Sequence, residues 1–170
     1  MSFVIGLPPS IPSNCRVLIL GSMPSVRSIQ LQRYYAHPRN RFWRVVIALL
    51  RLHPDSSIHQ CMLALHQHHI GLWDVIAQCR RHTSADSAIV WSSVRPNPLP
   101  ELIAQTSSLA RVLCNGQTAF RAWKHCIADH VRSELSVHLL PSTSPANARW
   151  SMEALVEAWR EHWPCVVNQA

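Results

Sequence analysis

The segment YYAHPRNRFWRVV, residues 34–46, concentrates side chains that could do chemistry. It contains both tyrosines of the chain, a His-Pro pair, three arginines and the amide of Asn40. Arginine binds phosphate through a planar group that donates two parallel hydrogen bonds, and fifteen of the sixteen basic residues are arginine. Together with the formal net charge of +7, the segment predicts contact with a polyanion. A genome that prefers arginine codons would explain the arginine excess equally well.

Several other kinds of chemistry find little support. The GSMPS string that begins at Gly21 lacks the spacing of a P-loop and is not followed by GxGxxG, which disfavours nucleotide cofactors. The chain has only four aspartates and five glutamates for a mechanism that needs two close carboxylates. The hydroxyl residues at 142–144 lack the GxSxG pattern of a serine nucleophile.

Cysteine and histidine give no clear metal site. The cysteines contain no CxxC pair, so we expect reduced, mostly buried thiols rather than a zinc ribbon or an iron-sulfur cluster. One histidine-rich run has metal-ligand residue types, but its spacing does not complete a tetrahedral set. We therefore predict neither a metal nor a cofactor. The cysteines are Cys15, Cys61, Cys79, Cys114, Cys126 and Cys165, and the run comprises His59, Cys61, His66, His68 and His69.

Short apolar runs alternate with helical patterns along the chain. An apolar helical face starts at Phe42, and Asn40 just before it is a candidate helix N-cap. Strands separated by helices of ten or more residues are typical of a parallel sheet with both faces covered. We predict a three-layer α/β/α sandwich with a short central parallel sheet, in one domain over residues 1–170. The predicted strands are 16–20, 70–76, 109–116 and 137–140, and the predicted helices lie near 42–53, 57–67, 98–105, 119–127 and 152–163.

In such a sheet the functional site lies outside the carboxyl ends of the strands. This rule selects four loops: GSMPSVRS, the WDV segment with Asp74, the Asn115-Gly116 pair, and PSTSPANARW at 141–150. No apolar run approaches the roughly 20 residues that a membrane span requires, and the first residues do not have the pattern of a signal peptide. We expect a cytoplasmic protein.

Six short strings occur in a fixed order: GSMPS, YYAHPRNRFWRVV, GLWDVIAQC, DSAI at 86–89, CNG and LPSTSPAN. Together, over about residues 16–160, they resemble the hypoxanthine-DNA glycosylase family of the uracil-DNA glycosylase superfamily. HPxNRFW is also similar to the mismatch-specific uracil/thymine glycosylases. The resemblance implies an enzyme of base excision repair that rotates a deaminated base, hypoxanthine first, out of DNA and hydrolyses its N-glycosidic bond. Because the only lysine, Lys124, falls in a predicted helix beyond the loop end, we expect no Schiff base and no strand cleavage.

The resemblance also assigns the residues of a base pocket. It places Asn40 as the catalytic residue, which would hold a water or hydrogen-bond the departing base, and Tyr35 as the ring under the flipped base. Met23 stands where many members of the superfamily have a carboxylate or an amide. Asp74 stands where relatives read the base edge with an asparagine, so it could accept a purine N–H, assist a water or cap a helix. The predicted substrate-binding residues are Gly21, Ser22, Met23, Pro24, Tyr35, His37, Asp74 and Asn115.

The loop after the last strand resembles the segment that presses on the DNA minor groove. Ser142 replaces the histidine of uracil-specific relatives, and Ala146 replaces a frequent leucine plug, which puts uracil preference and the plug in question. Trp150, Asn147 or Arg149 could take the place of the plug. The predicted DNA-binding residues are Arg39, Arg41, Ser142, Thr143, Ser144, Pro145, Ala146, Asn147 and Arg149.

Some alternatives stay open at this point. Asp86 and Ser87 could brace a loop or contact DNA, and Asn115-Gly116 could be a simple turn. The protein could prefer uracil or a G:U or G:T mismatch, could be a non-catalytic nucleic-acid-binding module, or could be a metal-dependent hydrolase that uses the histidines. The expected partner is damaged double-stranded or single-stranded DNA, bound by a monomer that is associated with the nucleoid and not with a membrane.

Overall fold

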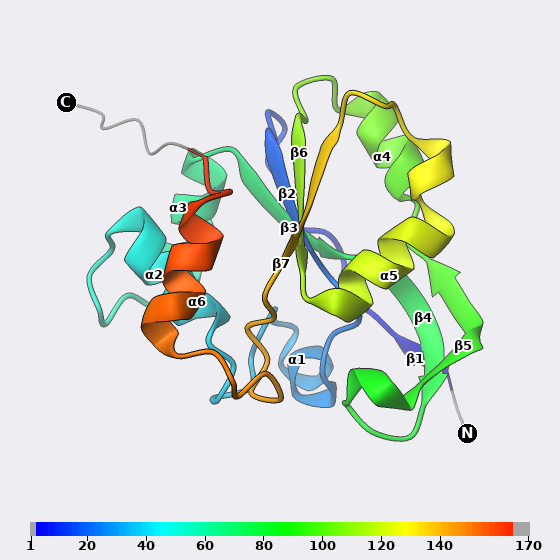
Figure 1. Ribbon diagram of the computed structural model, residues 1–170, viewed down its shortest axis with the longest axis horizontal. Helices are drawn as coiled ribbons and strands as arrows, with labels where there is room; N and C mark the ends of the chain where they lie inside the picture. Colours follow the sequence, from blue (N-terminus) through cyan, green and yellow to red (C-terminus); the bar gives the residue numbers. More distant parts are fainter. Residues whose placement is uncertain (1–2, 165–170) are drawn as a thin grey trace.

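Four parallel strands form the centre of the computed structural model, which describes residues 3–164 (Figure 1). Their spatial order is β3-β2-β6-β7. Every residue of β2 and β3 is buried, as expected for parallel strands that are covered on both faces. The strands are β2 (Val17–Gly21), β3 (Ile70–Asp74), β6 (Arg111–Asn115) and β7 (Ser136–Leu140).

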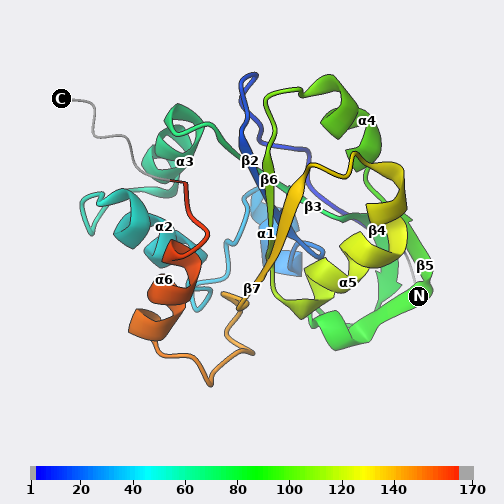
Figure 2. The ribbon, with the colours of Figure 1, turned by 45° about the horizontal axis from the view of Figure 1, so that its top comes forward.

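Helices cover both faces of this sheet, which confirms the predicted three-layer architecture (Figures 1 and 2). One side carries α2 (Phe42–Leu50), α3 (Ile58–Gln67) and α6 (Met152–Arg160), and the other carries α4 (Leu99–Gln105) and α5 (Gln117–Cys126). Phe42, Leu65 and Trp159 are fully buried between the first group and the sheet.

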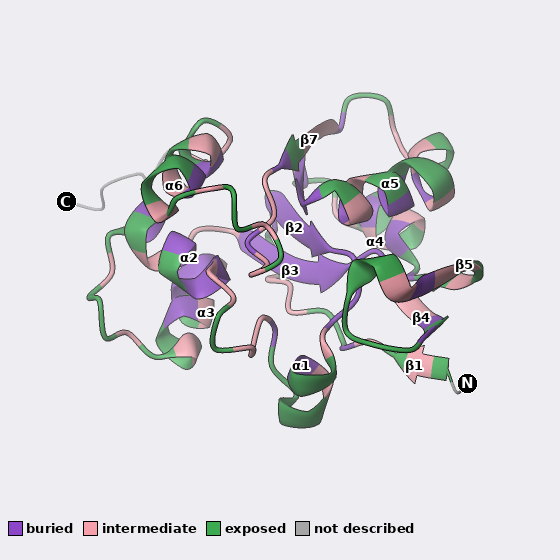
Figure 3. Ribbon diagram, turned by 60° about the horizontal axis from the view of Figure 1, so that its bottom comes forward, coloured by how far each residue is buried: buried purple, intermediate pink, exposed green. Residues whose placement is uncertain are grey.

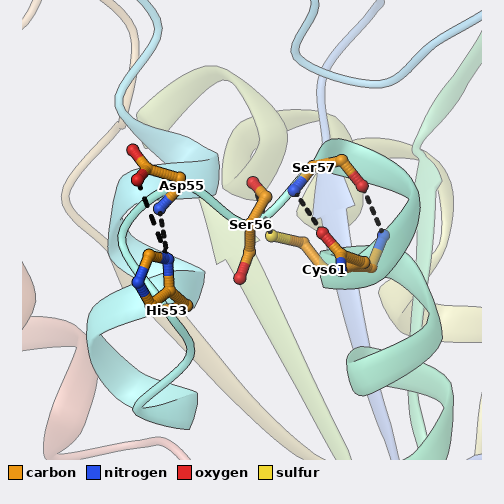
Figure 4. Close-up of polar contacts among 6 residues, drawn as sticks. His53, Asp55, Ser56, Ser57 and Cys61 are labelled. Carbon is orange, nitrogen blue, oxygen red and sulfur yellow. Dashed lines mark hydrogen bonds and ion pairs between the residues drawn. The ribbon is translucent and has the colours of Figure 1, made fainter.

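Local capping explains where several helices begin. Figure 4 shows the start of α3, where Ser57 Oγ accepts the main-chain N–H of Gln60 and the Gln60 side chain accepts the N–H of Ser57. His53 accepts the N–H of Asp55 in the preceding turn. Ser151 caps α6 in the same way by accepting the N–H of Ala154. Each such cap stabilises a helix by about 1 kcal/mol.

A second, antiparallel sheet was not predicted. The expected strand over 70–76 ends at Asp74, and after Val75 the chain enters β4 (Ile76–Arg81), the middle strand of the order β1-β4-β5. Three short helical elements also went unpredicted, and α6 ends before the predicted 163. The additional elements are β1 (Phe3–Ile5), β5 (Ile89–Pro96), α1 (Val26–Leu31), η1 (Asp86–Ala88) and η2 (Ala128–His130).

All four parallel strands end at one edge of the sheet, at the bottom of Figure 1. Gly21 pairs with Asp74, and Asn115 pairs with Leu140, so the loops that follow these residues lie together. Figure 3 turns this edge toward the viewer and shows exposed loops around the buried strand ends.

The cysteines that the structure describes carry free thiols. Four are buried and Cys126 is half-buried, whereas Cys165 lies outside the described residues. No helix within residues 3–164 is long and apolar enough to cross a membrane.

Candidate active site

The loop between α1 and α2 brings Tyr35 to the strand-end edge. Tyr35 adopts a left-handed backbone conformation with φ of 53°, which is uncommon for a residue with a side chain. Its ring stacks on Phe42 at 3.9 Å between ring centroids. Tyr34 anchors the loop because its hydroxyl donates to the Pro8 carbonyl at 2.8 Å and its carbonyl accepts the Trp43 indole N–H at 3.0 Å. Phe42 and Trp43 are buried.

His37 holds the turn that leads to Asn40. Its carbonyl accepts the N–H of Asn40 at 2.9 Å, and its ring Nδ1 accepts the N–H of Arg39 at 3.2 Å. The imidazole thus has a local structural role, and the substrate contact predicted for His37 stays a prediction.

The Asn40 side chain belongs to a network that joins three loops. Its Oδ1 accepts the N–H of Phe42 and the hydroxyl of Thr143, both at 3.0 Å. Because a main-chain N–H can only donate, the amide atom that faces Phe42 must be the oxygen. Two donors therefore occupy Oδ1, and the Nδ2 amino group is left for another acceptor. The bond to Phe42 also supports the start of α2, so the capping role and a site role are compatible.

Thr143 and Asn115 complete this network. The Asn115 side chain donates to Thr143 Oγ1 at 3.0 Å and accepts the Thr143 N–H at 2.9 Å. Thr143 has no exposed surface. It therefore lies inside the protein, as a link between the end of β6 and Asn40, rather than on the surface that its predicted DNA contact requires.

A second group of side chains surrounds Gly21 at the end of β2. A Cβ atom at this position would stand 2.2 Å from Asp74 Oδ1 and 3.3 Å from the Tyr35 hydroxyl, so only glycine fits. Asp74 is 4% exposed. Among the described residues, Asp74 Oδ2 and the Tyr35 hydroxyl are buried without a hydrogen-bond partner. An unpaired buried polar atom costs roughly 1–3 kcal/mol, so this corner is suited to receive a polar ligand.

The charge state of this corner depends on its surroundings. Burial raises the pKa of Asp74 to about 7, repulsion from Asp86 adds to the rise, and Arg81 opposes it. Burial, followed by the negative charge of Asp74, raises the pKa of Tyr35, so its hydroxyl stays protonated at neutral pH. The carboxyl of Asp74 is thus poised between its acid and its carboxylate form near physiological pH.

The hairpin between β4 and β5 braces the loop after β2. The hydroxyl of Ser22 donates to Asp86 at 2.7 Å, and the N–H of Val26 donates to the Ser84 hydroxyl at 3.0 Å. Two roles were considered for Asp86, bracing a loop and contacting DNA, and the bond to Ser22 shows the first. Met23 and Pro24 are buried in the same loop.

Sequence reasoning missed Arg81 in this region. Its guanidinium donates to the Pro24 carbonyl, and the residue is only 5% exposed. Nothing in the RR dipeptide at 80–81 shows which arginine points inward.

Arg41 fixes the loop at 141–150. Its guanidinium donates to the carbonyls of Trp150 at 2.5 Å and Asn147 at 2.9 Å, and its N–H donates to the Thr143 carbonyl at 3.0 Å. Asn147 in turn donates to the Ser142 carbonyl at 2.9 Å. The side-chain bonds use two of the five guanidinium N–H groups, and the phosphate contact predicted for Arg41 stays a prediction.

The rest of this loop is more accessible. Gly116 has φ of 98°, and a Cβ there would stand 2.7 Å from the Cβ of Ser142, so the strand-end turn and the loop pack closely. Ser142, Ser144 and Pro145 are half-buried, whereas Arg39, Ala146 and Arg149 are exposed. The DNA contacts predicted for them stay predictions.

The histidine-rich run forms no metal site within residues 3–164, where no three His, Cys, Asp or Glu side chains converge. His66 instead pairs with the Ser10 hydroxyl at 3.0 Å. Lys124 lies in the last turn of α5, with its ammonium 5.8 Å from the centre of the Phe120 ring.

Known proteins share this sequence and fold. Residues 8–163 match the model of the uracil DNA glycosylase superfamily. A hypoxanthine DNA glycosylase from Methanosarcina acetivorans is 35% identical over 147 residues, which are 86% of this chain and 89% of that protein. A hypoxanthine DNA glycosylase from Methanosarcina barkeri is 37% identical over 113 residues, 66% of this chain and 70% of its own.

A solved structure agrees with the sequence comparisons. The solution NMR structure of a Methanosarcina acetivorans protein, provisionally assigned as a uracil DNA glycosylase, superimposes with a TM-score of 0.74 at 30% identity. The match covers 94% of this chain and 98% of that one. Because the superfamily model matches residues 8–163 and a relative of 35% identity covers 86% of the chain, this chain belongs to the uracil DNA glycosylase superfamily.

Proposed function

We propose that this protein is a monofunctional DNA glycosylase that excises a deaminated base, hypoxanthine first, and leaves an abasic site. The observation that carries the proposal is the meeting of Asn40, Tyr35 and Asp74 at one edge of the sheet. The two relatives named hypoxanthine DNA glycosylase support the choice of base. The protein acts as a single domain, as a monomer and in the cytoplasm.

Asp74 is suited to recognise what deamination changes. Loss of the amino group of adenine turns its ring N1 from a hydrogen-bond acceptor into an N–H donor, and cytosine N3 changes in the same way. A carboxylate can only accept hydrogen bonds, so the ionised Asp74 would pair with the new N–H and repel the lone pair of the normal base. The buried, unpaired Oδ2 offers such an acceptor.

Tyr35 supplies the stacking surface for the flipped base. Phe42 covers one face of its ring, and a planar base would lie on the other face. The left-handed backbone at Tyr35 and the bonds of Tyr34 hold the ring in place before DNA arrives. An aromatic ring that is held in this way loses little entropy on binding.

Asn40 acts on the departing base through its amino group. Bond breaking runs ahead of attack in N-glycosidic cleavage, so negative charge collects on the leaving base. Because Phe42 and Thr143 occupy Oδ1, we favour donation from Nδ2 to the base over acceptance of a proton from water. Thr143 and Asn115 serve as positioning residues that aim this amide.

DNA would approach along the same edge. Arg39 and Arg149 are exposed there and are assigned to backbone phosphates, whereas Arg41 positions the loop at 142–147 that would face the minor groove. The side chain that fills the gap left by the base is drawn from Asn147, Arg149 and Trp150.

A lesion panel tests the proposal. Duplexes with inosine, uracil or xanthine are incubated with the protein in EDTA and then treated with alkali, and we expect cleavage at inosine above all. Asn40→Ala should lower excision by about 1,000-fold, the range of a lost transition-state donor. It should still bind DNA weakly and in a salt-sensitive way, because phosphate contacts supply that affinity.

Asn14→Ala is the matched control, because Asn14 is exposed in the turn before β2, at the opposite end of that strand. Full activity of Asn40→Ala would transfer the catalytic role, with Asp74 as the next candidate. DNA binding without excision of any lesion would favour a binding module, and activity that EDTA abolishes would favour a metal-dependent hydrolase.

A further inference from the structure

Arg81 is a buried arginine beside the base-reading corner. It ends β4, the strand that leaves the site after Asp74, and only 5% of its surface is exposed. One terminal amino group donates to the Pro24 carbonyl, while Nε and Nη1 are buried without a partner among the described residues. Burial of a guanidinium is costly unless nearby charges and hydrogen bonds offset it. An apolar side chain would fill this place without the desolvation cost of a charge. We therefore ask what function the charge of Arg81 serves.

Within residues 3–164, Arg81 forms no ion pair with Asp74 or with Asp86. Among residues 3–164 the ion pairs of arginine are limited to Arg160 with Glu157. The charge of Arg81 nevertheless acts on both Asp74 and Asp86. A cation that is not locked to one carboxylate can influence both and leave the acceptor atom of Asp74 open for a ligand.

We propose that Arg81 is a positioning residue of this active site, which fixes the loop after β2 through Pro24 and provides the positive charge that faces Asp74. The proposal rests on the proposed function in its use of Asp74 as the reader of the base. Through the loop, Arg81 acts on Ser22 and Met23, whose backbone borders the Gly21 corner. Through its charge, it favours the carboxylate form that distinguishes a deaminated base from its parent.

The groups that face Asp74 set the direction of the effect. Asp86 repels its charge, and Tyr34 and Tyr35 stay neutral. Arg81 is the one cation among residues 3–164 that lowers the pKa of Asp74. Removal of Arg81 therefore raises the pKa of Asp74 above about 7. The Asp74 carboxylate then forms at higher pH. Because excision needs this carboxylate, the pH at which excision sets in rises as well.

The neighbouring Arg80 provides a matched control. Its guanidinium lies on the other side of β4, exposed, 4.8 Å from the centre of the Phe3 ring. Arg80→Met and Arg81→Met remove the same charge one residue apart. Arg80→Lys and Arg81→Lys keep the charge but lose the planar group that reaches Pro24.

The test combines NMR titration of the Asp74 carboxyl carbon with single-turnover excision of hypoxanthine between pH 5 and pH 9. Arg81→Met should raise the Asp74 midpoint by about 1 pH unit or more, as removal of a nearby opposite charge does, and should move the acidic limb of excision equally. Arg80→Met should leave both in place. Arg81→Lys should keep the midpoint and lower excision by about 10-fold at every pH, through the lost hold on the loop.

An unchanged Asp74 midpoint in a folded Arg81→Met variant would overturn the proposal. If Arg81→Met does not fold, the two lysine variants decide. Equal excision rates for Arg81→Lys and Arg80→Lys would overturn the proposal, and slower excision by Arg81→Lys alone would support it. A wild-type protein that excises no lesion would defeat the proposed function. The NMR midpoints of Asp74 would still test the charge effect proposed for Arg81.

Discussion

Two corners of the same sheet edge treat their polar groups in opposite ways. Around Asn40, Thr143 and Asn115 the hydrogen-bonding groups satisfy one another, and Thr143 has no contact with solvent. Around Gly21, polar atoms of Asp74 and Tyr35 are buried and unpaired in the described chain. The buried groups of the first corner are paired without a ligand, and only the Asn40 amino group remains for one. We call it the complete corner, in contrast to the second, whose buried atoms lack partners.

This difference separates positioning from recognition. A satisfied buried network is rigid, so it can hold the Asn40 amide in one orientation before substrate arrives. An unsatisfied corner is costly in the free protein, and a ligand that pairs with it removes the cost on binding. We expect changes in the first corner to lower both stability and excision, and changes in the second to lower excision while they raise stability.

The largest effect should come from breaking the complete corner at Thr143. Thr143→Val keeps the shape of the side chain but removes the hydroxyl that bonds Asn40 and Asn115. The unfolding free energy should fall by about 1–3 kcal/mol because a buried donor loses its partner. Excision should fall by roughly 100-fold because the catalytic amide is no longer held. Urea unfolding and single-turnover excision measure both.

Thr143→Ser is the matched control, since it keeps the hydroxyl. It should retain excision within a few-fold and lose mainly the packing of one methyl group, worth about 1 kcal/mol. If the valine variant excised hypoxanthine as fast as the serine variant, the network would have no part in aiming Asn40.

A smaller effect, with the opposite sign for stability, is expected at Asp74. Asp74→Asn replaces a charged acceptor by a neutral one, so excision at pH 8 should fall by roughly 10-fold. We expect titration of Asp74 to give the wild type an acidic limb near pH 7, and this limb should disappear in the variant. The asparagine amide can also pair with adenine, so discrimination against the normal base should weaken.

The stability change of Asp74→Asn follows from the raised pKa. Because the folded protein holds the Asp74 proton to about pH 7 while the unfolded chain releases it near the ordinary pKa of 3.8, ionisation lowers wild-type stability as pH rises between these values. The variant should therefore match the wild type below about pH 4 and gain on it up to about pH 7. Thermal unfolding of both proteins at pH 4 and pH 8 measures the difference. If the variant and the wild type unfolded at the same temperature at both pH values, the folded protein would not raise the pKa of Asp74.

The contrast between the corners also shows what could be predicted from sequence. Apolar runs and helical periodicity indicated the parallel sheet, and parallel strands must end at one edge, so Gly21, Asp74 and Asn115 were expected to meet. The hydrogen bond between Asn40 and Thr143 joins residues 103 positions apart, and no local pattern encodes it. The recognition of individual roles at this edge came from the resemblance to a family.

The second sheet shows why the rest was missed. Its strand β5 contains two serines and ends at Pro96. Only Val75 separates the end of β3 from the start of β4. Such a sequence lacks a continuous alternating pattern. The inward direction of Arg81 depends on this sheet, and so does the brace from Asp86 to Ser22. Functional residues that a weakly patterned element carries are therefore the hardest to find.

Arg41 offers the smallest effect and tests the boundary of the complete corner. Its two guanidinium bonds to the carbonyls of Asn147 and Trp150 hold the loop beside Thr143. Arg41→Lys keeps the charge but loses the planar fork that holds both carbonyls, so excision should fall by about 3- to 10-fold through looser loop placement.

Salt dependence separates this role from a phosphate contact. A phosphate-bound arginine contributes to the slope of binding against salt, whereas an arginine that is occupied by carbonyls does not. Arg41→Met should therefore leave the salt slope of DNA binding unchanged, while Arg39→Met, at an exposed position of the same edge, should reduce it by about 1. An equal reduction in both variants would mean that Arg41 leaves the loop to meet DNA, and the complete corner would then extend no further than Thr143.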